Sequence, residues 1–293
     1  MKTLDVQARI RLKNILFCTD LSDAATAAFP YAAGLARHFG SKLYALHVKP
    51  WDQLEEFANQ WRQLSEADTR QEINELFEGS PGIDSEVLVE KNELWHSVES
   101  VIQQKQIDLV VLGTRGRSGL AKVLLGSAAE EIIRRAPCPV LSVGPHASTL
   151  LLGGGGIAQI LYATDFSPES IAAAPYAISL AQEYQAHLTL LHVLADSQTG
   201  DLPTSQQFAA SSERRLRELV PQEVELWCEP RFVIGHGSAG ETILQVAEHR
   251  KADLIVLGVR RAAGVPGAAT HLPIATAHKV VSHARCPVLT VRG

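Results

Sequence analysis

The chain contains the same sequence pattern twice. Residues 15–48 and 160–193 are identical at 16 of 34 positions when they are aligned without a gap. Two later pairs of blocks also match: Asp108–Gly113 with Asp253–Gly258 at the same offset of 145, and Cys138–Val143 with Cys286–Val291 at an offset of 148. A repeat of this extent predicts a duplicated domain, and the second copy has gained three residues between its two later blocks.

The repeat sets the domain borders of this 293-residue chain, whose length fits two domains of ordinary size. We predict a first domain at residues 11–145, a linker at 146–156 and a second domain at 157–293. The linker contains the run Gly153–Gly156, and glycine cannot hold regular structure cheaply because it loses much backbone freedom on ordering.

Each copy alternates short β-branched runs with longer helical patterns, which predicts βαβ units around a parallel sheet. The runs are apolar almost throughout, which is typical of strands covered on both faces. The expected strands lie near residues 14–19, 42–48, 85–89, 108–112 and 139–143, and near 160–164, 187–193, 231–234, 253–257 and 288–291. The expected helices lie near residues 23–38, 53–77, 94–105 and 127–135, and near 204–219 in the second copy. The fold class is therefore α/β.

Local signals refine two of these helices. The polar residues between Asp20 and Asp23 are expected to cap the first helix, and Gly40 is expected to end it. In the second helix, apolar residues between Trp51 and Leu64 recur every three to four positions. We interpret this stripe as core, with a partner-binding groove as the alternative.

Composition excludes several classes of function. A formal net charge of -5 and the lack of a Lys/Arg cluster argue against a surface that neutralises many nucleic-acid phosphates. Residues 1–9 lack the apolar core of a signal peptide, and no window reaches the roughly 18 apolar residues of a membrane-spanning helix. We therefore expect a cytoplasmic protein that binds neither nucleic acid nor membrane. The four cysteines form no Cys-x-x-Cys pair and are expected to be small core residues.

The segment from Gly113 to Ser127 carries the clearest functional signal. It leaves the carboxyl end of a predicted parallel strand, where open α/β sheets bind ligands. Gly113 and Gly116 let the backbone approach a ligand closely, while Gly126 and Ser127 offer amides and a hydroxyl at the positive end of a helix dipole. The segment therefore predicts a phosphate site. Arg115 would add positive charge to this site, or else remain solvated on an exposed loop.

Two common phosphate motifs are absent from the sequence. No Gly-Lys-Ser/Thr follows a glycine, and no Gly-x-Gly-x-x-Gly follows the first strand of either copy, which disfavours P-loop NTPases and NAD-binding enzymes. The spacing present is Gly-x2-Gly-x9-Gly-Ser, and it occurs in register with Asp20 after the first strand and His47-Val48 at the end of the second.

In these features the chain resembles the universal stress protein family, in its tandem form and over almost the whole length of both copies. The resemblance rests on Ile15–Ser22, Leu46–Val48, Asp108–Gly113, the glycine spacing and Cys138–Val143. It implies two Rossmann-like domains of the adenine-nucleotide α-hydrolase-like class, each a five-stranded parallel sheet sandwiched by helices.

The resemblance also implies a ligand, ATP, with or without Mg²⁺. The counterparts of Asp20 and Val48 surround the adenosine in the ATP-binding branch of the family, and those of Gly113, Gly116, Gly126 and Ser127 surround the ribose and phosphates. The first copy departs from the pattern at Glu90 or Lys91, where a glycine often ends the third strand.

The second copy departs from it at the centre of the loop. Gly258 is kept, but Arg261 stands in place of the second glycine, and Ile274 and Ala275 stand in place of the Gly-Ser pair. Side chains at these positions would crowd the backbone that phosphates approach. We therefore predict that the second domain does not bind ATP in the manner of the family.

Other readings of single residues stay open. Asp20 and Asp165 could simply cap a helix, and His47 and His192 are interpreted as packing and hydrogen-bonding groups rather than catalysts. We find no paired carboxylates, nucleophile with an adjacent base, or metal-binding spacing near the loop, so the sequence designates no catalytic or metal-ligating residue.

These observations lead to three functional hypotheses. The first is a cytoplasmic stress-response protein that binds ATP in its first domain as a sensor or regulator, with the second domain as a structural companion. The alternatives are a slow ATP hydrolase and a nucleotide-free interaction scaffold. The resemblance further implies an intramolecular domain pair joined through Val140–Val143 and Val288–Val291, and a homodimer is a further partner to test.

Overall fold

The structure is a computed structural model, and it describes residues 10–49, 65–114, 125–147, 156–195, 202–259 and 272–293. The fold is α/β, as predicted, with parallel strands and flanking helices. The chain divides into compact units, one formed by Arg11–Pro145 and the other containing His146–Gly293. Most of the linker expected at 146–156 lies outside the described residues.

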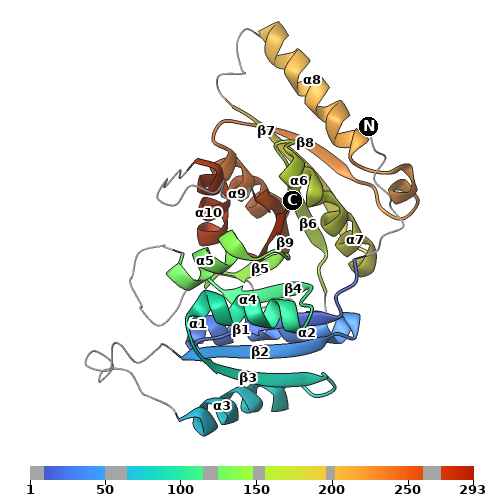
Figure 1. The fold of residues 1–293 in the computed structure, drawn as a ribbon. Helices are drawn as coiled ribbons and strands as arrows, with labels where there is room; N and C mark the ends of the chain where they lie inside the picture. The colour runs from blue at the N-terminus through green and yellow to red at the C-terminus, as the bar shows by residue number, and fades with distance from the viewer. Residues whose placement is uncertain (1–9, 50–64, 115–124, 148–155, 196–201, 260–271) are drawn as a thin grey trace. The chain divides into compact units, whose positions relative to one another are not determined.

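The first domain alternates strands and helices along the chain (Figure 1). Its strands are β1 (Asn14–Cys18), β2 (Lys42–Lys49), β3 (Ser85–Lys91), β4 (Leu109–Gly113) and β5 (Val140–Val143). Its helices are α1 (Asp23–Thr26), α2 (Phe29–Phe39), α3 (Glu66–Glu78), α4 (Leu94–Gln104) and α5 (Ser127–Arg135). Every strand expected from the apolar runs of this copy is present.

The strands of the first domain lie in the order β3-β2-β1-β4-β5, and neighbouring strands in this order are parallel. The chain crosses from β1 to β2 on one side and later returns to place β4 on the other side of β1. The strand order therefore reverses between β1 and β4, which creates the crevice at the carboxyl ends where open α/β sheets take ligands.

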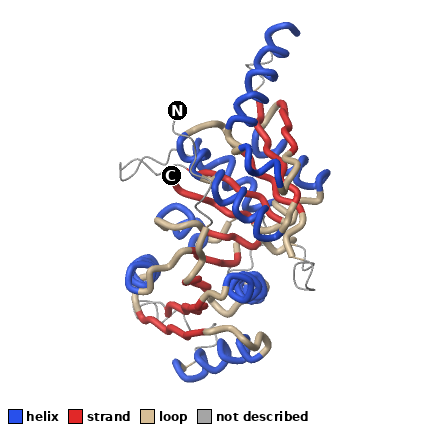
Figure 2. The backbone as a smooth tube through the Cα atoms, turned by 90° about the vertical axis from the view of Figure 1, so that its right-hand side faces the viewer, coloured by secondary structure: helices blue, strands red, loops and turns tan. Residues whose placement is uncertain are grey.

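Helices cover both faces of this sheet (Figure 2), and apolar side chains pack between the helices and the strands. On one face the ring of Phe17 in β1 packs against Phe29 of α2 at 5.5 Å, and Phe29 packs against Phe77 of α3 at 5.4 Å. On the other face Leu16 belongs to a buried cluster that includes Trp95 of α4. Neighbouring residues of β1 thus face opposite layers, as the pleat of a strand requires.

The first predicted helix, 23–38, is divided into two. Helix α1 ends at Thr26 and α2 begins at Phe29, with Pro30 at the start of α2. Proline lacks an amide hydrogen, so it suits the first turn of a new helix and not the interior of a continuous one. Gly40 ends α2 with a left-handed φ of 64°, as predicted.

The second predicted helix, 53–77, begins later than expected within the described residues. Ser65 is extended and forms a capping box with Asp68, so that α3 begins at Glu66. The apolar stripe from Trp51 to Leu64 lies outside the described residues.

The second domain repeats this architecture. Its strands are β6 (Gln159–Ala163), β7 (His187–Leu194), β8 (Arg231–His236), β9 (Leu254–Val259) and β10 (Val288–Arg292). Its helices are α6 (Pro168–Ala172), α7 (Ala174–Tyr184), α8 (Leu202–Glu218), α9 (Ala239–Arg250) and α10 (Leu272–His283), with a 3-10 turn at Gln222–Leu226. The strands lie in the equivalent order β8-β7-β6-β9-β10, and neighbouring strands in this order are parallel.

Cys286 lies in the core, as expected, and Cys18 and Cys138 are partly buried against a hydrophobic core cluster, whereas Cys228 is only partly buried. Burial raises the pKa of the Cys18 and Cys138 thiols to about 12, and it does the same for Cys286. A thiol that resists ionisation is a poor nucleophile and metal ligand.

Among the described residues, no helix combines the length and apolar character needed to cross a membrane.

Candidate functional site

Three strands of the first domain end at the same edge of the sheet. In register, Cys18 of β1 lies beside Leu46 of β2 and Leu112 of β4. Two residues further along the chain from these positions are Asp20, Val48 and Thr114. The sheet therefore brings Asp20 and Val48 to the edge where Gly113 ends β4, which is the crevice between β1 and β4.

Asp20 shapes the turn between β1 and α1. Its Oδ1 accepts a hydrogen bond from the amide of Ser22 at 3.0 Å, and Leu21 between them has a left-handed φ of 61°. The N-cap of α1 is Ser22, whose hydroxyl accepts from the Ala25 amide. The simple capping role weighed for Asp20 thus belongs to Ser22 instead, because Asp20 lies two residues before the N-cap position.

Gly113 has a packing role. A Cβ atom at this position would lie 2.5 Å from the carbonyl oxygen of Ala24 in α1. Real Cβ atoms do not approach backbone this closely, so α1 can cover the end of β4 only above a glycine. Gly258 in the second domain is under the same constraint, since its Cβ would lie 2.2 Å from the Cα of Ser170 in α6. This explains why the first glycine of the loop is kept in both copies.

The N-terminus of α5 closes the first-domain edge. Gly126 is the N-cap of α5 and Ser127 its first residue, and no side chain caps this helix end among the described residues. The amide of Gly126 donates to the Thr114 carbonyl at 2.9 Å. This hydrogen bond holds Gly126, at the start of α5, beside the end of β4. Arg115 and Gly116 lie outside the described residues.

His47 and His192 make the same hydrogen bond in the two domains. Nδ1 of His47 lies 3.0 Å from the carbonyl oxygen of Thr19, and Nδ1 of His192 lies 2.8 Å from that of Thr164. A carbonyl oxygen only accepts, so Nδ1 carries the proton in both rings. Each histidine ties the end of the second strand to the end of the first, which agrees with the hydrogen-bonding role expected for it.

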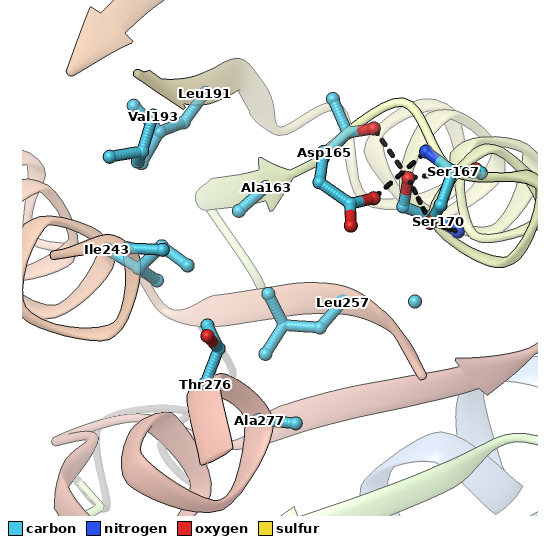
Figure 3. Close-up of a pocket in the computed structure, with 13 residues that line it drawn as sticks. Ala163, Asp165, Ser167, Ser170, Leu191, Val193, Ile243, Leu257, Thr276 and Ala277 are labelled. Carbon is cyan, nitrogen blue, oxygen red and sulfur yellow. Dashed lines mark hydrogen bonds between the residues drawn. The ribbon is translucent and has the colours of Figure 1, made fainter. Parts of the chain in front are cut away.

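The second domain contains a cavity of about 350 Å³ at the corresponding edge (Figure 3). It lies at the carboxyl ends of β6, β7 and β9 and is closed by the starts of α6 and α9 and by α10. Its lining contains Asp165, Val193 and Gly258, the counterparts of Asp20, Val48 and Gly113. The cavity therefore lies in the domain that the sequence predicts not to bind ATP in the manner of the family.

This cavity has one polar side and one apolar side. Figure 3 shows Asp165, Ser167 and Ser170 together on one side, with Val193 and Ile243 across the cavity from them. Its remaining lining residues are small or apolar apart from two threonines: Ala163, Thr164, Leu191, Ala239, Leu257, Gly258, Thr276 and Ala277. Lysine, arginine and histidine are absent from the described lining.

The helix at this edge begins differently in the two domains. Gly126 and Ser127 are the N-cap and first residue of α5, but α10 begins at Leu272, so Ile274 and Ala275 lie inside it. Arg261 lies outside the described residues. The positions that correspond to the phosphate-binding pair in the first domain are thus ordinary helical residues in the second.

A comparison of the two repeats contains a signal for the cavity, namely smaller side chains in the second copy. Two lining residues are smaller than their counterparts: Ala163 replaces Cys18, and Ala239 replaces Leu94. In the first domain the side chains of Cys18 and Leu94 pack against the buried cluster around Leu16. Removing that volume at one edge of the sheet leaves space that the remaining side chains do not fill.

Within the described residues, no three His, Cys, Asp or Glu side chains gather as metal ligands would. At the carboxyl ends of the strands, the described polar groups are backbone, carboxylate and hydroxyl groups, which can form hydrogen bonds to a ligand.

Comparison with known sequences identifies one protein family in both halves of the chain. The model of the universal stress protein family matches residues 11–144 and again residues 156–292. A universal stress protein of Methanocaldococcus jannaschii is 35% identical over 144 residues, which are 45% of this chain and 81% of the relative. One from Synechocystis is 26% identical over 309 residues, which cover 96% of this chain and all of the relative. The alignment with one from Mycobacterium tuberculosis spans 64% of this chain and 62% of that protein.

Solved structures share the fold. The crystal structure of a universal stress protein from Archaeoglobus fulgidus matches with a TM-score of 0.70 and 20% sequence identity, and the match covers 97% of this chain and 99% of that one. Similarity at this level of sequence identity shows a common fold and nothing further. The tandem α/β fold is therefore found in solved relatives.

Proposed function

Because this chain belongs to the universal stress protein family, we propose that its first domain binds ATP, alone or with Mg²⁺, as a cytoplasmic sensor or regulator. Nucleotide occupancy would change the conformation of the domain or its affinity for a partner. The second domain would not bind ATP in this manner.

The observation that carries the proposal is the position of Gly126. It is the N-cap of α5, its amide is bonded to the end of β4, and no described side chain caps the helix beside it. Backbone amides at a helix N-terminus and the helix dipole both favour a phosphate. The hydroxyl-bearing Ser127 follows directly.

The neighbouring strand ends suit the nucleoside. Asp20 and Val48 lie at the same sheet edge, and Val48 packs on the apolar cluster below it. A carboxylate can accept from ribose hydroxyls, and a half-buried valine offers an apolar surface to a base. Arg115 and Gly116 are assigned to the phosphates from the sequence.

The first test is the nucleotide content of the purified protein. The chain is denatured, and released nucleotide is quantified by chromatography and mass spectrometry. We expect close to one adenine nucleotide per chain, or one uptake site for added ATP. The variant Gly126→Val should reduce ATP affinity at least tenfold, because a branched side chain would stand beside the helix amides. Its backbone, with φ −63° and ψ 146°, is one that valine adopts readily, so the fold should survive.

Ser127→Ala is the matched control, since it removes a hydroxyl and keeps the amides. It should weaken ATP binding less than Gly126→Val does. Two ATP molecules per chain would contradict the assignment to one domain. No nucleotide released and none taken up would favour the scaffold hypothesis. Phosphate release that disappears with binding in Gly126→Val would indicate a slow hydrolase.

A further inference from the structure

We propose that the second domain binds the phosphate group of a small soluble molecule at a basic cluster beside the amino ends of its strands. The basic cluster consists of His187 at the start of β7, Arg231 at the start of β8, Arg250 at the end of α9 and Lys251 directly after it. These residues are far apart in the sequence and are brought together by the fold. They lie at the end of the sheet opposite to the carboxyl ends of the strands, so the inference does not rest on the proposed function.

The first domain shows what the same corner of the fold contains when its charges are balanced. The two carboxylate oxygens of Glu86 each bind an ammonium group, that of Lys42 at 2.9 Å and that of Lys105 at 2.7 Å. Both ammonium groups also lie over the ring of Tyr44, at 5.1 and 5.3 Å from its centre. The hydrogen bonds from Lys105 and Lys42 lower the pKa of Glu86. This corner of the fold therefore holds one oxyanion between two cations.

The basic cluster occupies the corresponding positions of the second domain, at the repeat offset of 145. Arg231 has the same register between β8 and β7 as Glu86 has between β3 and β2. The two helices also end alike, since Lys251 has a left-handed φ of 52° and its counterpart Gln106 one of 51°. The second domain thus replaces Lys42, Glu86 and Lys105 by His187, Arg231 and Arg250.

The positive charges of the basic cluster are not balanced by the equivalent carboxylates. In the first domain the two lysines act on two carboxylates, Glu86 and Asp84. In the second domain Glu229 is the remaining one of these, beside two arginines and a lysine, which leaves an excess of two positive charges when histidine is counted as neutral. Among the described residues, neither Arg231 nor Arg250 forms an ion pair. Such a surface concentrates anions from solution.

The end of α9 explains part of the basic cluster but not Arg231. Cationic side chains are favoured at the C-terminus of a helix, where they offset the negative end of its dipole, and this accounts for Arg250 and Lys251. Arg231 is exposed on a strand. Glu248, in the last turn of α9, is already paired with Arg285 at 2.5 Å. The charge of Arg231 therefore calls for an anion from outside the domain.

The guanidinium groups select the class of anion. Arginine presents N–H donors in a planar fork that matches two phosphate oxygens at a time. Two arginines and a lysine suit the double negative charge of a phosphate group better than the single charge of a carboxylate. Arg231 and His187 are exposed, so the phosphate can be bound while the rest of its molecule stays in solvent. The net charge of -5 disfavours nucleic acid as its source.

The experiment titrates the intact protein with pyrophosphate at constant ionic strength and follows backbone amide signals by NMR. We expect saturable shifts at residues 187–189, 229–231 and 249–251. Arg231→Glu should weaken this binding at least tenfold, because it introduces the carboxylate that the first domain has at this position. The same fold accommodates that residue in its other copy, so the midpoint of thermal unfolding should be unchanged or raised.

Arg214→Glu is the matched control, because it changes the net charge by the same amount. Arg214 is exposed on α8, which packs on the other face of the sheet. The guanidinium of Arg217 on this helix lies 4.5 Å from the centre of the Phe232 ring, and Phe232 follows Arg231 in the pleat of β8. The control should weaken pyrophosphate binding at the basic cluster less than twofold.

Three results would overturn the proposal. The first is no saturable shift at these residues at millimolar pyrophosphate. The second is equal weakening by Arg231→Glu and Arg214→Glu, which would indicate a general effect of charge. The third is binding of vesicles that contain phosphatidic acid without binding of pyrophosphate, which would indicate a membrane surface. Failure of the ATP site in the first domain would leave this test unchanged, because the NMR signals report on each residue separately.

Discussion

At the scale of single residues, the end of β7 carries an unusual histidine. The ring of His192 packs on Phe166 at 4.4 Å, and the guanidinium of Arg215 lies 4.0 Å from the centre of the same phenyl ring. Burial lowers the pKa of His192, and the positive charge of Arg215 lowers it further, while the Thr164 carbonyl and the Asp165 carboxylate act in the opposite direction. The folded protein therefore favours the neutral form of this imidazole over the charged form, relative to the unfolded chain.

This environment predicts a pH dependence of stability. The unfolded chain protonates His192 near its ordinary pKa of 6.5, whereas the folded domain protonates it only at lower pH. Between these two values the unfolded state binds more protons, so the free energy of unfolding falls as the pH is lowered through that window. Urea unfolding between pH 7.5 and pH 5 should show a smaller acid loss for His192→Gln than for the parent. His249→Gln, at an exposed position on α9, should keep the parental slope, and equal slopes for the parent and His192→Gln would refute the argument.

At the scale of elements, the close approach of α1 to β4 and of α6 to β9 decides which glycines the loops retain. The missing Cβ atoms of Gly113 and Gly258 are replaced in space by backbone of the helix above. Gly113→Ala and Gly258→Ala should each destabilise their domain by about 1–3 kcal/mol, as overpacking does.

Gly34 is the matched control for these substitutions. It is exposed on α2 and has no heavy atom within 4 Å of a built Cβ, so Gly34→Ala should stabilise the protein by about 0.5–1 kcal/mol. Chemical denaturation of the three variants gives the comparison. If Gly113→Ala were as stable as Gly34→Ala, the packing role of Gly113 would be wrong.

At the scale of the whole molecule, the two copies keep one fold and differ in what their ligand edges offer. The first edge has a helix N-terminus at Gly126 that no described side chain caps, and the second has a cavity with a carboxylate and apolar walls. We therefore interpret the duplication as a separation of roles between two similar domains.

Hydrogen exchange on the intact protein tests this separation. A ligand that binds only the folded state stabilises it by about 2.7 kcal/mol at a concentration of 100 Kd. Saturating ATP should slow amide exchange mainly within residues 11–145. Equal protection of residues 11–145 and 157–293 by ATP would contradict the assignment of ATP to the first domain.

The repeated pattern predicted the strands well, because a strand buried on both faces must be apolar along its length. The end of α2 was also predicted correctly, because a glycine such as Gly40 readily adopts the left-handed backbone that ends a helix. The break between α1 and α2 and the start of α3 at Glu66 were missed, although Pro30 and the Ser65–Asp68 capping pair were visible signals. Apolar periodicity runs through such boundaries, since it records which face is buried and not where backbone hydrogen bonds end.

The sequence by itself determined the duplication, the α/β class, the family and the first-domain residues that are candidates for a nucleotide. Each of these depends on residue identity and spacing along the chain. Only the tertiary structure decided that Gly113 and Gly258 lie beneath a helix, that Ser22 caps α1, and that the second domain contains a cavity. Such features depend on distances between segments far apart in the chain and on the volume that their side chains leave unfilled, and no local pattern encodes either quantity.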